Sequence, residues 1–219
     1  MLKCSGREVG IMNYDLMMEE QIKNCVPGTK LLLHVCCGPC SSTCLERLGN
    51  HFEISILYYN PNITDKDEYE KRVEEVNKLI SLLKTKYPVK LIEGRYDPKE
   101  FFDMAKGMED LPERSERCYK CYSLRLEETA KVADELGFDY FATSLTLSPY
   151  KKTDWLNEIG ESLNDKFNCT YLYSDFKKKN GYKRSIELSK EFDLYRQDYC
   201  GCVYSKRDYL ERINKKDRD

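Results

Sequence analysis

The sequence contains no long hydrophobic run, no glycine-rich phosphate loop and no Ser/His/Asp order. Its longest apolar stretches, such as the leucines at 31–33, are far shorter than the roughly 20 residues that cross a bilayer. A membrane-spanning protein is therefore excluded. The first twenty residues contain Glu19 and Glu20 but no apolar signal segment, so we expect a cytoplasmic protein without a membrane partner.

Neither sign of charge dominates the chain. The 219 residues include 36 Lys and Arg against 38 Asp and Glu, which gives a net charge of -2. From Tyr171 to Asp219, however, 13 basic residues face 9 acidic ones. The whole chain is therefore no nucleic-acid polycation, although its C-terminal quarter could present a basic face. The mean hydropathy of -0.69 comes with 17 Tyr and 8 Phe, enough to build a core and to exclude wholesale disorder.

Cysteine is the residue type that stands out. An odd count of eleven argues against a secreted disulfide framework. In a reducing compartment, clustered thiols usually bind a metal or perform redox chemistry. The clusters are Cys36, Cys37, Cys40 and Cys44; Cys118 and Cys121; and Cys200 and Cys202, while Cys4, Cys25 and Cys169 stand alone.

Short apolar segments alternate with helical patterns along the chain. This order predicts a three-layer α/β fold with a mainly parallel sheet and helices on both faces, Rossmann-like or adenine nucleotide hydrolase-like. We expect an N-terminal helical extension over residues 1–29 and a single α/β domain over 30–219. The expected strands are 30–35, 54–59, 89–93, 140–144 and 170–173, and the expected helices are 41–48, 65–86, 98–106, 116–136, 153–166 and 184–192.

Two distant segments should meet at one edge of this sheet. Open parallel sheets bind ligands at the carboxyl ends of their strands. Cys36 and Cys37 follow the first expected strand, and residues 143–148 close the fourth. His34, one of two histidines, lies inside the first strand and is predicted to be a core residue rather than a ligand.

Four thiols are candidates for one metal centre. Cys36 and Cys37 lie beside a helix N-terminus, which favours the thiolate form. Cys118 and Cys121 are three residues apart on an expected helix, so both sulfurs face the same way. Together they suit either structural Zn²⁺ or an iron–sulfur cluster, and their spacing does not choose between the two.

Cys200 and Cys202 form a C-x-C pair. A disulfide between them would be strained and labile, which suits a catalytic redox pair better than a structural crosslink. Because C-x-C also occurs in metal sites, a role as additional ligands stays open.

Three polar segments are candidates for contact with a nucleotide. The residues after the second strand can hydrogen-bond a polar ligand, although turns are their commoner use. The hydroxyl-rich loop 143–152 suits phosphate or sugar contacts. Segment 176–184 combines cations and aromatic rings, as sites for unpaired nucleotides do, and a solvated face explains it equally well. The candidates are Asn60, Asn62, Ser148, Lys151, Lys183 and Arg184.

Taken together, the chain resembles the QueH-type epoxyqueuosine reductases. The matching motifs run in family order from about residue 30 to about residue 205, and they are specific as a set although each alone is weak. They are CCGPC at 36–40, YNPNI at 59–63, EYEKR at 68–72, RCYKC at 117–121, the loop 143–151, GYKRS at 181–185 and YRQDYCGC at 195–202.

The resemblance implies an oxidoreductase that reduces epoxyqueuosine in the tRNA anticodon to queuosine, the final step of queuosine biosynthesis. It also implies an iron–sulfur centre, a [4Fe-4S] cluster. The ligands carried over from the family pattern are Cys36, Cys37, Cys118 and Cys121.

Other roles follow from the same resemblance. Cys200 and Cys202 correspond to a redox-active disulfide. The family pattern also includes an additional adjacent metal ion, taken as iron, for which Cys40 is the candidate ligand. Arg196 joins the candidate tRNA contacts. Electrons would come from an unidentified low-potential donor, ferredoxin- or flavodoxin-like, and residues 1–29 inherit no role.

Two other protein classes stay open. One is a thiol-dependent tRNA sulfurtransferase or a related nucleotide-activating α/β enzyme, which should carry an ATP-pyrophosphate loop after the first strand, where residues 36–40 stand instead. The other is a non-catalytic RNA-binding module stabilised by Zn²⁺. Iron with sulfide in anaerobically purified protein indicates the reductase, whereas zinc without sulfide indicates the module.

Overall fold

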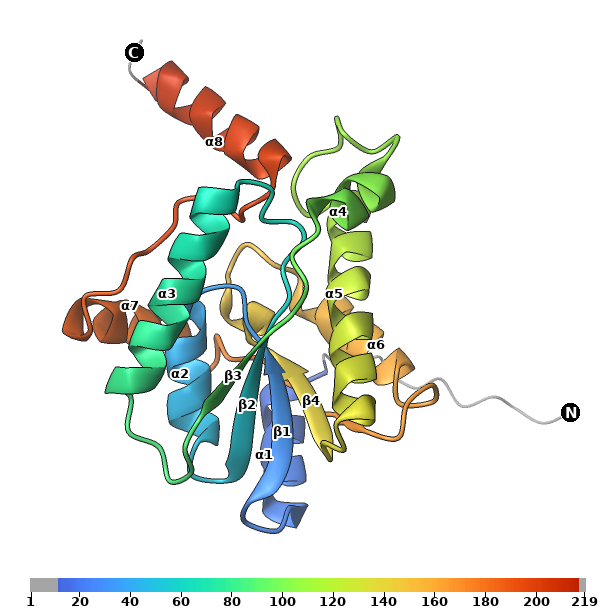
Figure 1. Cartoon of the computed structure of the whole chain (residues 1–219), viewed down its shortest axis with the longest axis vertical. Coiled ribbons are helices and arrows are strands. Elements are labelled where there is room, and N and C mark those ends of the chain that lie inside the picture. Colours follow the sequence, from blue (N-terminus) through green and yellow to red (C-terminus); the bar gives the residue numbers. More distant parts are fainter. Residues whose placement is uncertain (1–11, 217–219) are drawn as a thin grey trace, which may run out of the picture.

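The computed structural model describes residues 12–216. Within this range five parallel strands form one sheet in the order β3-β2-β1-β4-β5, with helices on both faces (Figure 1). The expected three-layer α/β fold is therefore confirmed. The strands are β1 (Thr29–His34), β2 (Phe52–Tyr58), β3 (Lys90–Glu93), β4 (Tyr140–Thr143) and β5 (Thr170–Tyr171).

The central strands are buried on both faces, which explains their nearly continuous apolar sequence. Leu31 and Leu33 of β1 face a core built with α2 (Gly38–Leu48) and α3 (Lys66–Leu82). Leu32, between them, faces the opposite core, built with α5 (Glu116–Glu135) and α6 (Thr153–Ser162). Successive side chains of one strand thus hold both helical layers against the sheet.

The strand order reverses direction beside β1. The chain runs outward from β1 to β2 and β3, then returns to place β4 on the other side of β1. Such a switch point opens a crevice outside the carboxyl ends of the strands. The loop after β1 and the 3-10 turn after β4, η1 (Ser144–Leu147), both lie at that edge.

The N-terminal segment packs on the sheet domain through α1 (Tyr14–Asn24). Buried Asp15 of α1 pairs with Arg47 of α2 at 2.7 Å. The Gln21 side chain donates to the carbonyl of Tyr171 and accepts from the amide of Tyr173, so α1 is tied to the β5 edge. Cys4 lies outside the described residues.

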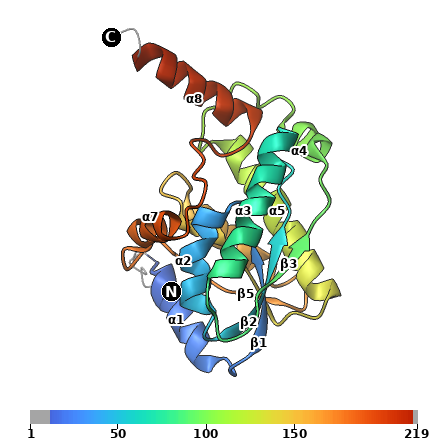
Figure 2. The same ribbon diagram turned by 60° about the vertical axis from the view of Figure 1, so that its left-hand side comes forward.

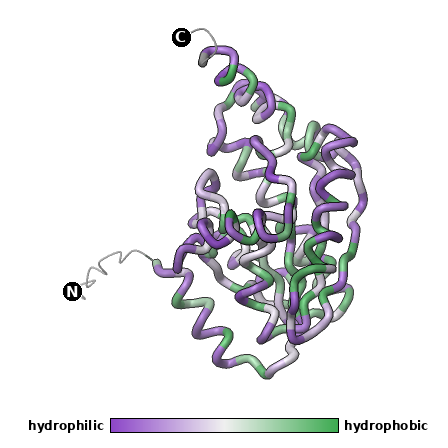
Figure 3. Tube along the Cα trace, turned by 90° about the vertical axis from the view of Figure 1, so that its left-hand side faces the viewer, coloured by the Kyte–Doolittle hydropathy of each residue, from purple (hydrophilic) through white to green (hydrophobic). Residues whose placement is uncertain are grey.

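The remaining helices are α4 (Pro98–Ala105), α7 (Gly181–Glu191) and α8 (Val203–Lys216). The sequence analysis assigned no helix to 203–216. In the structure α8 projects from the body beyond the carboxyl edge, and hydrophilic and hydrophobic residues alternate along it (Figures 2 and 3). None of the described helices is both long and apolar enough to cross a membrane.

Candidate functional site

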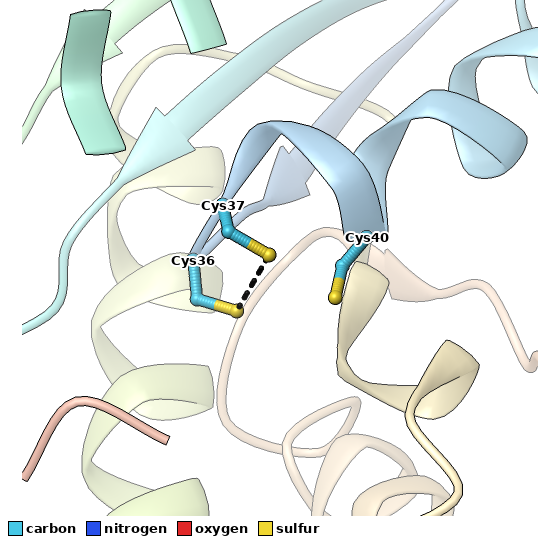
Figure 4. Close-up of side chains that lie close together, drawn as sticks. All are labelled: Cys36, Cys37 and Cys40. Carbon is cyan, nitrogen blue, oxygen red and sulfur yellow. Dashed lines mark hydrogen bonds between the residues drawn. The ribbon is translucent and has the colours of Figure 1, made fainter. Parts of the chain in front are cut away.

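Three thiols converge where β1 passes into α2. The sulfurs of Cys36, Cys37 and Cys40 all lie within 4.8 Å of one another (Figure 4). Cys37 is the N-cap residue of α2, and Pro39 stands in its first turn, where the missing proline N–H is not needed. The turn brings Cys40 back toward Cys36, so three thiols face one point beside a helix N-terminus.

The three thiols differ in acidity because they contact one another. Hydrogen bonds from Cys37 and Cys40, helped by the nearby cations Lys151 and Arg125, lower the pKa of Cys36 below its usual range. The same contacts raise the pKa of Cys37, and the bond to Cys36 together with burial raises the pKa of Cys40 to about 12. Cys36 is therefore the thiolate of the group, and its neighbours are donors to it.

Thiols from three distant segments line one cavity of about 390 Å³, which we call the thiol cavity. This volume lies within the range of about 300–1,000 Å³ typical of small-molecule pockets. Sequence-predicted site residues make up part of its wall: Cys36, Cys40, Cys118, Cys200, Ser148, Lys151 and Arg196.

Cys37, Cys121 and Cys202 lie outside the cavity lining. Cys37 is buried with Cys36 and Cys40, whereas Cys121 and Cys202 share a small buried cluster with Phe101. Burial raises the pKa of Cys121 to about 12, and the charges of Cys200 and Cys202 add to this rise. The structure thus gathers all seven cysteines that the sequence analysis selected near one edge of the sheet.

The C-x-C loop is held in place by a buried arginine. Arg72 of α3, 1% exposed, pairs with Glu68 at 2.6 Å. It donates to the carbonyl oxygens of Cys200 at 3.1 Å and Tyr199 at 3.3 Å. Arg72 therefore satisfies two loop carbonyls while its own charge stays paired, and Cys200 is directed to the cavity.

Glycine is required between the two cysteines of this loop. Gly201 has φ +119°, a conformation that side chains rarely adopt, and an added Cβ would lie 2.8 Å from Cγ1 of Ile63. The close approach lets the Gly201 carbonyl accept from the Thr64 amide at 3.4 Å. The loop after β2 thus holds the C-x-C segment in place.

Several candidate contacts lie away from the cavity. Asn60 is fully buried, donating to the Val35 carbonyl and accepting from Arg125, both at 2.8 Å. Asn62 is buried too, and Lys183 and Arg184 are outside the lining. Arg184 is engaged with Glu46 at 2.6 Å.

His34 is a core residue, as predicted. Its two ring nitrogens lie 3.1 Å from the Thr143 hydroxyl and 3.1 Å from the Tyr59 carbonyl. Burial and the adjacent Arg125 guanidinium lower the pKa of His34 to about 3, so the ring is neutral. The remaining described thiols pack in the interior: Cys25 is partly buried, and Cys44 and Cys169 are buried.

Sequence reasoning missed three positioning residues. Gln197 donates its side-chain N–H to the Cys37 sulfur at 3.0 Å. Arg72 of α3 and Arg125 of α5 are buried cations. Arg72 and Gln197 lie in the motifs at 68–72 and 195–202, and Arg125 lies in none of the motifs, but nothing in the local sequence marks the contacts of these side chains.

The donor set fits a thiolate-bound centre. Thiolate sulfur is the ligand of iron–sulfur clusters and of soft metal ions. Three sulfurs already converge, two more line the same cavity, and buried cations stand beside them. Arg72, Arg125 and Lys151 offset the negative charge that several thiolates would bring into a buried site.

Comparison with known proteins identifies the family of this chain. A family model described as "Epoxyqueuosine reductase QueH" matches residues 31–208. Proteins named epoxyqueuosine reductase QueH from Streptococcus pyogenes and Staphylococcus epidermidis are each 42% identical over 201 residues, covering 90% and 89% of this chain and 79% and 84% of theirs. The one from Thermotoga maritima is 36% identical over 188 residues, 84% of this chain and 93% of its own. The chain belongs to the epoxyqueuosine reductase QueH family, a family of oxidoreductases.

Proposed function

We propose that this protein is a cytoplasmic tRNA-modifying enzyme that reduces epoxyqueuosine in the anticodon to queuosine, with its catalytic machinery in residues 30–219. One observation carries the proposal: thiols from three distant segments line a single cavity at the switch point of the sheet, in a chain of the QueH family. The alternatives, a sulfurtransferase or a zinc-stabilised RNA module, have no comparable support.

The same proposal assigns the ligands. Cys36, Cys37, Cys118 and Cys121 hold a [4Fe-4S] cluster, and Cys40 serves an adjacent metal ion, iron. A cluster held there would pass electrons one at a time, and the adjacent metal ion would offer a Lewis acid. The cations Arg72, Arg125 and Lys151 would offset the negative charge that these sulfurs carry as ligands.

Cys200 and Cys202 are proposed as the dithiol of the reaction. Converting an epoxide to an alkene consumes two electrons and two protons and releases one water. Oxidation of two thiols to a disulfide supplies two electrons and two protons, so the reaction balances. Electrons from a low-potential ferredoxin- or flavodoxin-like donor, with two protons, then restore the dithiol for the next turnover.

Charged side chains of the cavity wall orient the substrate. Burial alone would lower the pKa of Lys151, but the charges of Cys200 and Cys36 raise it above its usual value, so Lys151 is an ammonium. An ammonium at this place can hold a hydroxyl or phosphate oxygen of the nucleotide. Arg196, anchored by the carbonyl of Ser185 at 3.2 Å, offers a second cationic contact.

The decisive experiment uses anaerobically purified holoprotein, tRNA containing epoxyqueuosine and a low-potential reductant. Nucleoside mass analysis should reveal queuosine, and metal analysis should find iron with sulfide. Zinc without sulfide, or no queuosine with an intact cluster, would refute the proposal. Cys200→Ala should keep the visible absorbance of the cluster and lose turnover, and unchanged turnover would reject the dithiol role.

A further inference from the structure

The wall of the thiol cavity extends onto a helix that the chemistry above does not use. Arg212 and Lys215 of α8 are exposed, yet they line the same cavity as Cys36 and Cys200. Helix α8 stands beyond the carboxyl edge of the sheet, away from the body (Figures 1 and 2). A ligand larger than the cavity would therefore meet α8 as it enters.

The cations of α8 are not equally available. Residues 203–216 hold five Lys and Arg against two Asp and Glu. Lys206 pairs with Asp65 at 2.9 Å, and Arg207 lies near Asp110 and Asp208. Within residues 12–216, no carboxylate lies within ion-pair distance of Arg212 or Lys215. These two cations can therefore bind an external anion without first losing a partner.

Carboxylates restrict where that anion can lie. Asp208 and Glu211 line the cavity one turn before Arg212 and Lys215, and Glu113 and Asp198 line it too. They repel a polyanion from the inner wall. This repulsion favours contact of the phosphodiester backbone with the outer turns of α8, while the inner cavity, with Lys151 and Arg196 in its wall, admits the modified nucleoside.

An exposed aromatic ring also lines the cavity. Tyr150 is 66% exposed, follows η1 and is adjacent to Lys151. Its backbone N–H donates to the Ser148 hydroxyl at 3.3 Å, which holds the loop that presents the ring. Exposed aromatic rings beside cations stack on unpaired bases in proteins that bind single-stranded RNA.

We propose that α8 and the loop of Tyr150 form the docking surface for the anticodon stem–loop of tRNA, an inference that rests on the proposed function. Arg212 and Lys215 bind the phosphodiester backbone, and Tyr150 stacks on an unpaired base next to the modified nucleotide. The modified base then enters the thiol cavity between them. A surface of this kind gives a role to the exposed ring and to the two α8 cations that have no carboxylate partner among residues 12–216.

The test measures RNA binding and not turnover. The probe is a fluorescently labelled, unmodified anticodon stem–loop RNA, added to holoprotein over a range of salt concentrations. Affinity decreases as salt rises, so the slope of log affinity against log salt is negative. In R212A/K215A the magnitude of this slope should decrease by about 2, because two phosphate contacts are lost. Tyr150→Ala should weaken binding about 5- to 150-fold, and Tyr150→Phe should bind as the wild type does.

The matched control removes two exposed lysines from the segment between α3 and β3, at the amino edge of the sheet, K84A/K86A. It should retain the wild-type slope. Wild-type affinity and slope in R212A/K215A, or no binding of the stem–loop by the wild type, would overturn the docking surface. If R212A/K215A shows the predicted change in slope but the wild-type protein forms no queuosine, the proposed reaction is refuted. The docking surface would still be supported in that case.

Discussion

The two edges of the sheet are built from the same strands but hold different kinds of residue. At the carboxyl edge, the segments after β1 and β4 bring together ionisable thiols, buried cations and the thiol cavity. At the amino edge, His51 precedes β2, Gly137 precedes β4 and Cys169 precedes β5. The fold supplies both edges, and chemistry is built at the one where the strand order reverses.

Two cysteines illustrate what this difference means. At the amino edge Cys169 is buried beside the Ala130 carbonyl, and burial together with Asp134 raises its pKa to about 11. At the carboxyl edge Cys36 is equally buried, but thiol donors and cations lower its pKa. Burial alone therefore makes a thiol inert, whereas burial among donors and cations makes it a ligand or a nucleophile.

The largest expected difference is between removing a thiol at the carboxyl edge of the sheet and removing a thiol at the amino edge. Cys118→Ala removes a proposed ligand and should abolish the visible absorbance of the cluster and all turnover. Cys169→Ala removes one buried atom and should cost about 1 kcal/mol of unfolding free energy while cluster and activity persist. Absorbance spectra, iron and sulfide content and urea unfolding measure both. Full activity in Cys118→Ala would show that the ligand assignment is wrong.

Next in size is the effect of the hydrogen bond to Cys37. Gln197→Leu keeps most of the side-chain volume but removes the N–H donor that lies 3.0 Å from the sulfur. Partners that orient a metal ligand typically contribute about 10- to 100-fold in metal affinity or activity. We expect cluster loss to a competing chelator to rise accordingly.

Gln197→Glu is the companion variant to Gln197→Leu. It places a carboxylate beside the thiolate and should lose the cluster faster still. Equal retention of iron in the wild type and both variants would show that the contact has no role in holding the centre.

The fold was predictable because local pattern decides it. All five strands were predicted to within a few residues. The central strands bury side chains on both faces of the sheet, so their sequences are almost entirely apolar, as at 31–33 and 54–58. Two helices end earlier than expected: α3 at Leu82 and α6 at Ser162. Helix α8 was missed because it is the most polar of the described helices and has no long apolar run.

The site was only half predictable. The thiols were found because their spacing and their place after a strand are local features. Arg72 and Gln197 act on partners 128 and 160 residues away in sequence, and no local pattern encodes such contacts. Conversely, segment 176–184 looked like a nucleotide site, but Lys179 pairs with Glu19 and Arg184 with Glu46, so much of its charge is used within the chain.

Replacing a glycine should also have different effects at the carboxyl and amino edges of the sheet. Gly201→Ala should cost about 2–3 kcal/mol of unfolding free energy, because φ +119° is strained for alanine and the new Cβ meets Ile63. Gly137→Ala, at φ +67° with open space around it, should cost about 1 kcal/mol. Urea unfolding compares the two, and equal costs would mean that the C-x-C loop yields without strain. Only Gly201→Ala should also reduce turnover, since Cys200 moves.

The last expected effect is a pH dependence of stability that comes from His34. Unfolded His34 binds a proton near pH 6.5, but the folded ring does so only near pH 3. Between these values the unfolded state binds more protons, so the free energy of unfolding falls as pH falls, by up to about 1.4 kcal/mol per unit. His34→Gln should flatten this slope between pH 6.5 and pH 5, whatever its effect on absolute stability. The wild-type slope in His34→Gln would mean that His34 is protonated in the folded protein.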